Sequence, residues 1–277
     1  MFALLVGALP TLLVTRRDLF SCAAAAAVTV RPTAAAASPP ASQQQLIREA
    51  STAFQKADYQ TSERLWKELT TEDPNSSLGW SNYAVCAVIN SSEDPHMQLG
   101  VAPSGAAKER LEEALVALQR AEALDEVPDA LNLNTRGNAL SLLLRWQEAR
   151  QAYSASATAS RRDFESIPRS NEALALFELG DLKEAERTTR TLLRRDPQFK
   201  DGYALLAALR FEQDSKSDAA TLISDLCSGL DGEQWCSRYS NIDVVVGRWT
   251  PSAVAAYRRL LAEPSIQLEL RNGARPR

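Results

Sequence analysis

Residues 166–199 read SIPRSNEALALFELGDLKEAERTTRTLLRRDPQF, and this stretch decides the fold. Gly180-Asp181 lies in its middle and marks a turn between two helices. Asp196-Pro197 lies near its end, where proline cannot continue a helix. Ala173 and Ala185 place one small residue in each half, so that two helices can approach each other closely. The stretch therefore predicts an antiparallel helical hairpin.

The same hairpin pattern recurs along the chain. Its first positions are Gln43, Ser77, Ala130, Ser166 and Lys200. Three of the four steps between them are 34 or 36 residues long, and the step from Ser77 to Ala130 is 53 residues long. The extra residues fall at about 90–107, where Asn, Ser, Asp, Pro and Gly gather, so we expect a surface loop there. Five such hairpins predict an all-α, right-handed α-solenoid, because each hairpin needs a neighbour to cover its apolar face.

Residue types at fixed offsets in these hairpins resemble the tetratricopeptide-repeat (TPR) family. The two positions of closest helix contact are small in every repeat: Ala50, Ala84, Gly137, Ala173 and Ala207 on the first helix, and Ser62, Ala114, Ala149, Ala185 and Ala219 on the second. Large side chains fill the space between helices: Leu46, Trp80, Leu133 and Tyr203 from the first helices, and Trp66, Leu118, Tyr153 and Ile223 from the second. Arg169 is the exception among the first-helix positions. The resemblance implies a protein that binds other proteins.

The repeat pattern ends near residue 228. Thr250-Pro251 then opens a helical stretch, Ser252 to Ala262, which we expect to cap the last repeat. The expected organisation is a signal at residues 1–37, a linker at 38–44, the repeat array at 45–227, a cap at 228–264 and a flexible tail at 265–277.

The first 37 residues have the composition of an export signal. Arg16-Arg17 is followed by an alanine-rich apolar run and then by the small residues Ala34 to Ala37, which suit a cleavage site. The run is shorter and less apolar than a membrane anchor. We therefore expect a cleavable twin-arginine signal, with the mature chain beginning between Ala35 and Ser38.

Two motifs narrow the resemblance. Leu133 to Leu140 with Arg145 to Ala149, and Arg248-Trp249-Thr250-Pro251 in the cap, resemble TPR proteins of cyanobacteria and of the chloroplast thylakoid lumen. Thr250 departs from that family's pattern, which has proline there. The resemblance implies a lumenal protein without catalytic activity that assists, stabilises or docks on a photosynthetic membrane complex such as a photosystem. Contact with the membrane would then come only through protein partners.

The twin-arginine pathway serves both the thylakoid lumen and the bacterial periplasm. Met1 to Val14 lacks the basic, Ser-rich transit peptide of plastid import. Either the sequence lacks an upstream part, or Phe2 to Val14 belongs to a first signal of a complex plastid, or the source is a bacterium. The alternative function is therefore a periplasmic adaptor that binds envelope proteins.

The composition argues against several other functions. The net charge of −4 provides no basic surface for nucleic acid. His96 is the only histidine, and no phosphate loop, dinucleotide motif or Cys/His metal spacing accompanies it. We expect no enzymatic activity, no cofactor and no metal.

Two of the four cysteines are candidates for a disulfide. Cys22 leaves with the signal, and Cys86 falls on an alanine-like helix position, where we expect it to be buried. Cys227 and Cys236 flank a short loop at the junction with the cap. In an exported protein they could form a disulfide; otherwise they would be two packing residues.

The inner face of such a solenoid, built from its first helices, is the expected binding surface. Four asparagines fall at inner positions: Asn82, Asn134, Asn138 and Asn171. Asn134 and Asn138 are one turn apart, so both amides share one helix face and could hold an extended partner segment. Alternatively, one of these amides maintains the superhelix, or partners bind the outer face or the loop.

Overall fold

The structure, a computed structural model, describes residues 40–95, 97, 100–160, 164–228 and 231–273. All secondary structure in these residues is helical, as the repeat pattern predicts. Ten helices form five antiparallel hairpins: α2 (Ala41–Gln55) with α3 (Tyr59–Glu72), α4 (Ser77–Ser92) with α5 (Gly105–Leu124), α6 (Ala130–Leu142) with α7 (Trp146–Ala159), α8 (Ser166–Glu178) with α9 (Leu182–Arg195), and α10 (Lys200–Glu212) with α11 (Lys216–Leu226).

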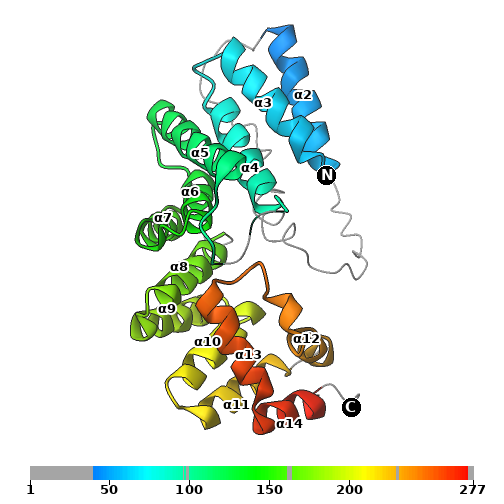
Figure 1. Ribbon diagram of the computed structural model, residues 1–277, viewed down its shortest axis with the longest axis vertical. Helices are drawn as coiled ribbons and strands as arrows, with labels where there is room; N and C mark the ends of the chain where they lie inside the picture. The colour runs from blue at the N-terminus through cyan, green and yellow to red at the C-terminus, as the bar shows by residue number, and fades with distance from the viewer. Residues whose placement is uncertain (1–39, 96, 98–99, 161–163, 229–230, 274–277) are drawn as a thin grey trace, which may run out of the picture.

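Successive hairpins stack into an arc, as Figure 1 shows. The last four hairpins begin at the predicted residues. The first begins at Ala41, inside the segment 38–44 that we expected to be a linker. None of the described helices has the length and apolar character required to cross a bilayer.

The turns inside the hairpins share one backbone conformation. Ala57, Leu144, Gly180 and Asp214 have φ values of 58°, 59°, 78° and 59°, in the left-handed region that ends a helix. In two of these turns an aspartate follows and caps the next helix. Asp58 accepts from the backbone N–H of Thr61 at 3.1 Å, and Asp181 accepts from that of Glu184 at 3.2 Å.

Small residues allow the two helices of each hairpin to pack closely, as predicted. The alanines at the two close-contact positions are all 0% exposed, and so is Ser62. Gly137 is the tightest case, because a Cβ there would lie 2.4 Å from the ring of Tyr153. The glycine of α6 therefore makes room for the tyrosine of α7.

The insertion in the second repeat is shorter as a loop than we expected. Helix α4 continues to Ser92 and α5 begins at Gly105, so the loop covers residues 93–104 and not about 90–107. Ala107 is only 5% exposed, because α5 packs closely along α4. Longer helices account for the rest of the insertion.

The C-terminal region forms α12 (Gly232–Tyr239), a short 3-10 helix (Ile242–Val244), α13 (Pro251–Ala262) and α14 (Pro264–Gly273). The expected cap helix is thus α13, but it packs across α10 and α8, which are the first helices of repeats five and four. In Figure 1 it lies within the arc and not beyond its end. The cap therefore occupies the inner face of the last two repeats.

The expected flexible tail at 265–277 is wrong for its described part. Residues 264–273 form α14, which packs against α11, α12 and α13. Ile266 is 0% exposed and Leu270 is 7% exposed, so this helix belongs to the core of the cap. Residues 274–277 lie outside the described residues.

Candidate functional site

A cavity of about 130 Å³ lies on the inner face where the third and fourth repeats meet the cap. Helices α6, α7 and α8 form its walls, together with Met97, Gly100 and Val101 of the inserted loop and residues 247–251 that lead into α13. Ligand pockets for drug-sized molecules usually measure about 300–1,000 Å³. This cavity is therefore better matched to one side chain of a polypeptide than to a small-molecule cofactor.

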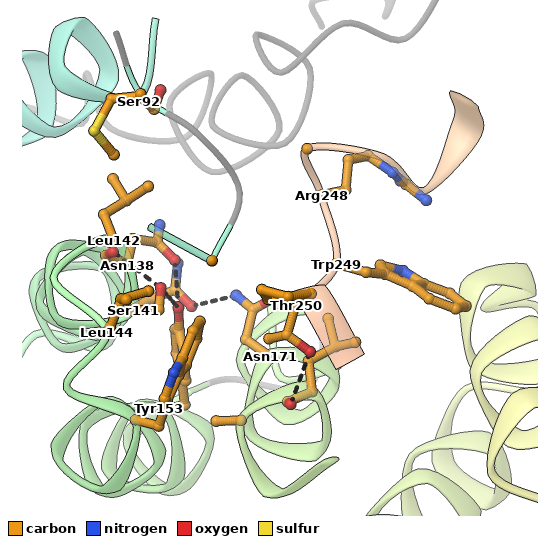
Figure 2. A pocket seen from close by; sticks show the side chains of 18 of the residues that line it. Ser92, Asn138, Ser141, Leu142, Leu144, Tyr153, Asn171, Arg248, Trp249 and Thr250 are labelled. Carbon is orange, nitrogen blue, oxygen red and sulfur yellow. Dashed lines mark hydrogen bonds between the residues drawn. The ribbon is translucent and has the colours of Figure 1, made fainter. Parts of the chain in front are cut away.

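Hydroxyl and amide groups line one wall of the cavity (Figure 2). The Tyr153 hydroxyl donates to Asn138 Oδ1 at 2.9 Å and lies 3.1 Å from Ser141 Oγ. Ser141 Oγ in turn donates to the backbone oxygen of Asn138 at 3.0 Å. Burial raises the pKa of Tyr153 far above its usual value, so the hydroxyl stays protonated and can donate. These bonds fix the orientation of the Asn138 amide.

A second amide pair joins two repeats at the same cavity. Asn171 Nδ2 on α8 donates to Asn134 Oδ1 on α6 at 3.2 Å. Asn134 is only 1% exposed, whereas Asn171 is half-buried. The pair therefore links repeat three to repeat four, which is the structural role that we considered as an alternative for these amides.

Three of the four predicted groove residues come together here. Asn134, Asn138 and Asn171 all line the cavity. Asn82 does not: it is 6% exposed and its Nδ2 donates to the Leu78 backbone oxygen of its own helix at 2.9 Å. The period placed Asn82 on the inner side, but the α4 side chains there are buried among their neighbours.

Asn138 is the most available of these amides. It is half-buried, and its Oδ1 is held by Tyr153 while its Nδ2 has no hydrogen-bond partner in the part of the chain that the structure describes. An amide N–H that points into a cavity can donate to a backbone carbonyl of a bound segment. The two asparagines therefore differ: Asn138 keeps a donor for a bound segment, whereas Asn134 links repeat three to repeat four.

The cap closes the cavity through residues that sequence reasoning did not assign to the site. Arg248 forms an ion pair with Asp201 of α10, and Trp249 Nε1 lies 3.5 Å from the same carboxylate. Figure 2 shows both side chains turned away from Asn138. Thr250 Oγ1 donates to the Leu174 backbone oxygen of α8 at 3.3 Å. The backbone of residues 247–251 therefore forms this wall of the cavity. In the sequence, the Arg-Trp-Thr-Pro motif marks this segment.

The ion pair at Asp201 is buried and well bonded. Arg248 also donates through Nε to the Val244 backbone oxygen at 2.6 Å, and the Tyr239 hydroxyl donates to Asp201. Burial alone would lower the pKa of Arg248, but the Asp201 carboxylate raises it overall. Burial, together with that carboxylate, raises the pKa of Tyr239. Arg248 therefore stays charged and anchors the wall segment to repeat five.

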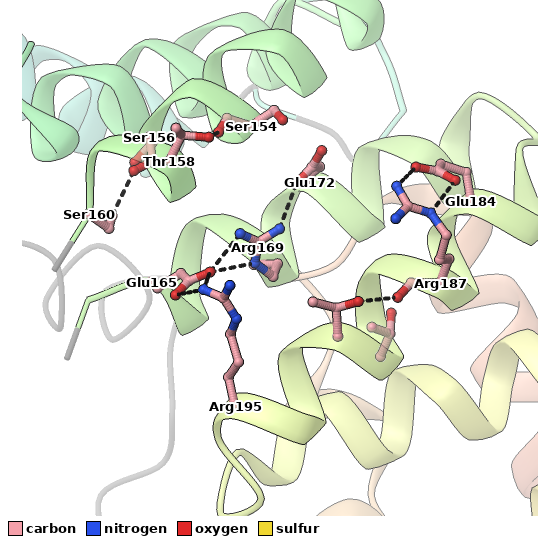
Figure 3. A network of polar contacts seen from close by, with 12 residues as sticks. Ser154, Ser156, Thr158, Ser160, Glu165, Arg169, Glu172, Glu184, Arg187 and Arg195 are labelled. Atoms are coloured by element: carbon pink, nitrogen blue, oxygen red, sulfur yellow. Dashed lines mark hydrogen bonds and ion pairs between the residues drawn. The ribbon is translucent and has the colours of Figure 1, made fainter. Parts of the chain in front are cut away.

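Arg169, the exception among the large first-helix side chains between helices, belongs to a different polar cluster (Figure 3). Its guanidinium donates to Glu165 Oε1 at 2.6 and 2.9 Å, and Arg195 donates to the same carboxylate at 2.5 and 2.6 Å. Burial alone would raise the pKa of Glu165, but the two arginines lower it below its usual value. In repeat four, an ion pair thus takes the place of the large apolar side chain that the other repeats have between their helices.

The structure brings Cys227 and Cys236 together as a disulfide, with the sulfur atoms 1.95 Å apart. The bond joins the end of α11 to α12, and a Cβ on Gly273 would lie 2.6 Å from Cys236 Sγ. Cys86 is a free, buried thiol, as expected. Arg16, Arg17, the cleavage region 35–38 and His96 lie outside the described residues.

The cavity offers hydrogen bonds and apolar contacts. Its lining combines amides and hydroxyls with apolar side chains such as Leu142, Trp146 and Leu174, and Arg248 is the one ionisable side chain besides Tyr153 among its lining residues in the described structure. The described residues also contain no group of three His, Cys, Asp or Glu side chains placed to hold a metal. This chemistry suits recognition of a polypeptide.

Comparisons with known proteins bear on the fold. No protein-family model and no curated protein matches the chain. Among solved structures, MamA is similar over 71% of this chain and 94% of its own, with a TM-score of 0.54 and 14% identity. PilW, described as a widely conserved type IV pilus biogenesis factor, is similar over 83% and 99%, with a TM-score of 0.53 and 15% identity.

Pseudomonas aeruginosa PilF is similar over 82% of this chain and 95% of its own, with a TM-score of 0.52 and 16% identity. The chain is a TPR-like α-solenoid. Identities this low establish the fold alone.

Proposed function

We propose that this TPR-like solenoid is a non-catalytic scaffold that holds a segment of a partner protein against its inner face, with the cavity at Asn138 as the anchoring point. The observation that carries the proposal is the Asn138 amide, which is oriented by Tyr153 and leaves its Nδ2 directed to no protein group in the described residues. A bound segment would supply a backbone carbonyl to this donor and an uncharged side chain to the cavity.

The cap limits where such a segment can lie. Helix α13 covers the inner face of α8 and α10, and the chain at 247–251 closes the cavity on that side. Residues 82–89 of α4 are all buried, so that helix offers no open surface either. A partner segment would therefore reach the cavity beside α6.

We further propose that the scaffold works in the thylakoid lumen, on subunits of a photosynthetic membrane complex such as a photosystem. The support is the twin-arginine pattern at Arg16-Arg17 and the resemblance of the residues 133–149 and 248–251 motifs to lumenal TPR proteins. The second candidate is a periplasmic adaptor for envelope proteins. The same export pattern favours it, and PilW, one of the similar structures, is described as a pilus biogenesis factor.

Recovery of partners by single-site variants tests the inner-face proposal. Tagged mature protein would be incubated with mildly solubilised thylakoids, or with bacterial envelopes for the second candidate, and bound proteins identified by mass. Asn138→Ala should weaken binding by about 1–3 kcal/mol with little loss of stability, because it removes a free donor from a half-buried site. Asn134→Ala should lower stability first, because it leaves the Asn171 amide without its acceptor.

Asn82→Ala is the matched control, since Asn82 is an inner-face asparagine outside the cavity. The double variant of Asn134 and Asn138, checked for helicity by circular dichroism, completes the set. Unchanged partner recovery by well-folded Asn138→Ala and double variants would refute binding at the cavity. It would direct attention to the inserted loop at residues 93–104.

A further inference from the structure

A second, open groove of about 860 Å³ lies beside repeat three, between α7 and the segment that leads from α5 into α6. Its lining includes Val127, Leu133, Arg150, Ser154 and Thr158. None of its lining residues borders the inner-face cavity, although α7 contributes to both. Figure 3 shows Ser154 and Thr158 on the same helix, with the Thr158 hydroxyl donating to the Ser154 backbone oxygen at 2.9 Å.

Arg150 is the unusual member of this groove. Its Nε is buried without a hydrogen-bond partner, and the described residues give its guanidinium no ion pair. Glu184 of α9 is close enough for the charge of Arg150 to affect its pKa, but the main cause of that lowered pKa is Arg187, which donates to Glu184 at 2.8 Å. Arg150 therefore has no carboxylate at ion-pair distance in the described chain, and Glu184, which it affects from farther away, is already bonded to Arg187.

The equivalent positions in two other repeats show the contrast. Arg150 is the fifth residue of α7, and Glu63 and Glu186 are the fifth residues of α3 and α9. Glu63 pairs with Arg110 at 3.3 Å, and Glu186 pairs with Arg190 at 2.7 Å and Arg210 at 3.0 Å. In these two repeats the charge at this position is paired within the chain, whereas the described residues provide no ion pair for Arg150 in repeat three.

The groove also presents apolar side chains together with Arg150. Val127 is 67% exposed, and Leu133 is half-buried at the groove wall. A guanidinium fork binds a carboxylate with two parallel hydrogen bonds, and its interaction is stronger beside apolar groups that exclude water. The groove thus combines a site for one negative charge with contact area for neighbouring apolar side chains.

We propose that this groove is a second docking surface, which binds an acidic segment of a partner protein. A Glu or Asp carboxylate of that segment accepts from Arg150, and an apolar side chain beside it packs on Val127 and Leu133. The surface is independent of the Asn138 cavity. With both in use, the solenoid would hold two segments at once, which is how a scaffold joins parts of an assembly.

Peptide titration of the isotope-labelled mature protein tests this proposal. The probes are acetyl-ALEELA-amide and its uncharged counterpart acetyl-ALQQLA-amide, followed by the NMR signals of the Leu133 methyl groups and the Arg150 guanidinium. The acidic peptide should bind about tenfold more tightly than the amide peptide, because it alone supplies a carboxylate to the guanidinium. Added salt should reduce the difference.

Three variants make the result specific. Arg150→Gln should abolish the difference between the two peptides. Arg258→Gln, which removes the same charge from the exposed face of α13, should preserve it. Ala155→Glu should weaken binding of the acidic peptide, because it adds a carboxylate to the groove while Arg150 stays in place.

Equal affinity of the two peptides for the wild-type protein would overturn the proposal, and so would an unchanged difference in Arg150→Gln. Signal changes confined to residues of the Asn138 cavity would also overturn it. Loss of partner recovery in Asn138→Ala bears only on the first surface, so the two proposals can fail separately.

Discussion

Gly137→Ala should destabilise the solenoid, although alanine is normally the better helix former. The added Cβ would lie 2.4, 2.5 and 2.8 Å from three ring atoms of Tyr153. Contacts this short cannot persist, and the ring has little room to move because Tyr153 is 4% exposed. The tyrosine, or the whole of α7, must shift.

The magnitude follows from three contributions. Overpacking of a core costs about 1–3 kcal/mol, and the rigid ring puts this case toward the upper end. A shifted Tyr153 also strains its hydrogen bond to Asn138, which contributes about 1 kcal/mol. The helix propensity of alanine over glycine offsets about 1 kcal/mol of this. The expected net loss is about 2–3 kcal/mol, or about 4–12 °C in melting temperature for a chain of this size.

Gly79→Ala is the matched control for this prediction. Gly79 also lies in the first helix of a hairpin, but the nearest atoms to an added Cβ are 3.4 Å away, which is ordinary contact. It should be neutral or slightly stabilising. Urea and thermal unfolding of both variants would be followed by circular dichroism. If Gly137→Ala were as stable as Gly79→Ala, the packing argument for the cavity wall would be wrong.

Three further predictions concern the cap, the ion pairs and the targeting of the chain. Replacing Cys227 and Cys236 by serine should cost about 2–3 kcal/mol, because the bond closes a short loop in the unfolded chain; a reductant should affect the wild type and not the variant. Glu165→Gln should make stability less sensitive to acid. The pKa of Glu165 lies below its usual 4.5, so its contribution is present above that value and is lost as pH falls through the lower folded pKa; parallel acid denaturation curves would contradict this. Changing Arg16 and Arg17 to lysine should leave uncleaved precursor outside the compartment, whereas terminal sequencing of a native protein that still begins at Met1 would remove the export claim.

The sequence was informative where local chemistry repeats. Ser77, Ala130, Ser166 and Lys200 were predicted as helix starts and are helix starts, because small contact residues and turn residues recur at a fixed period. Each hairpin obeys the same local rules, so one clear repeat identifies the others. The period could also place Asn134 and Asn138 on one face of α6.

The cap could not be predicted in the same way, because it occurs once. The sequence indicated a helix after Thr250-Pro251 but not that it would lie across α8 and α10, since that placement rests on contacts with residues far away in the sequence, among them the Arg248–Asp201 ion pair. The burial of α14 and of Asn82 likewise depends on neighbouring helices. Closure of the cavity is therefore a tertiary property, and the sequence predicted only its amides on α6 and α8.

Photo-crosslinking from inside the cavity tests whether a partner segment binds there. The mature protein would carry benzoylphenylalanine in place of Leu142, which lines the cavity, or in place of Thr221, which is exposed on α11. After irradiation with solubilised thylakoid or envelope proteins, adducts would be identified by mass. We expect one main adduct from position 142 that is lost with Asn138→Ala, and little from position 221. Equal adducts from both positions, or an adduct at 142 that survives Asn138→Ala, would contradict it.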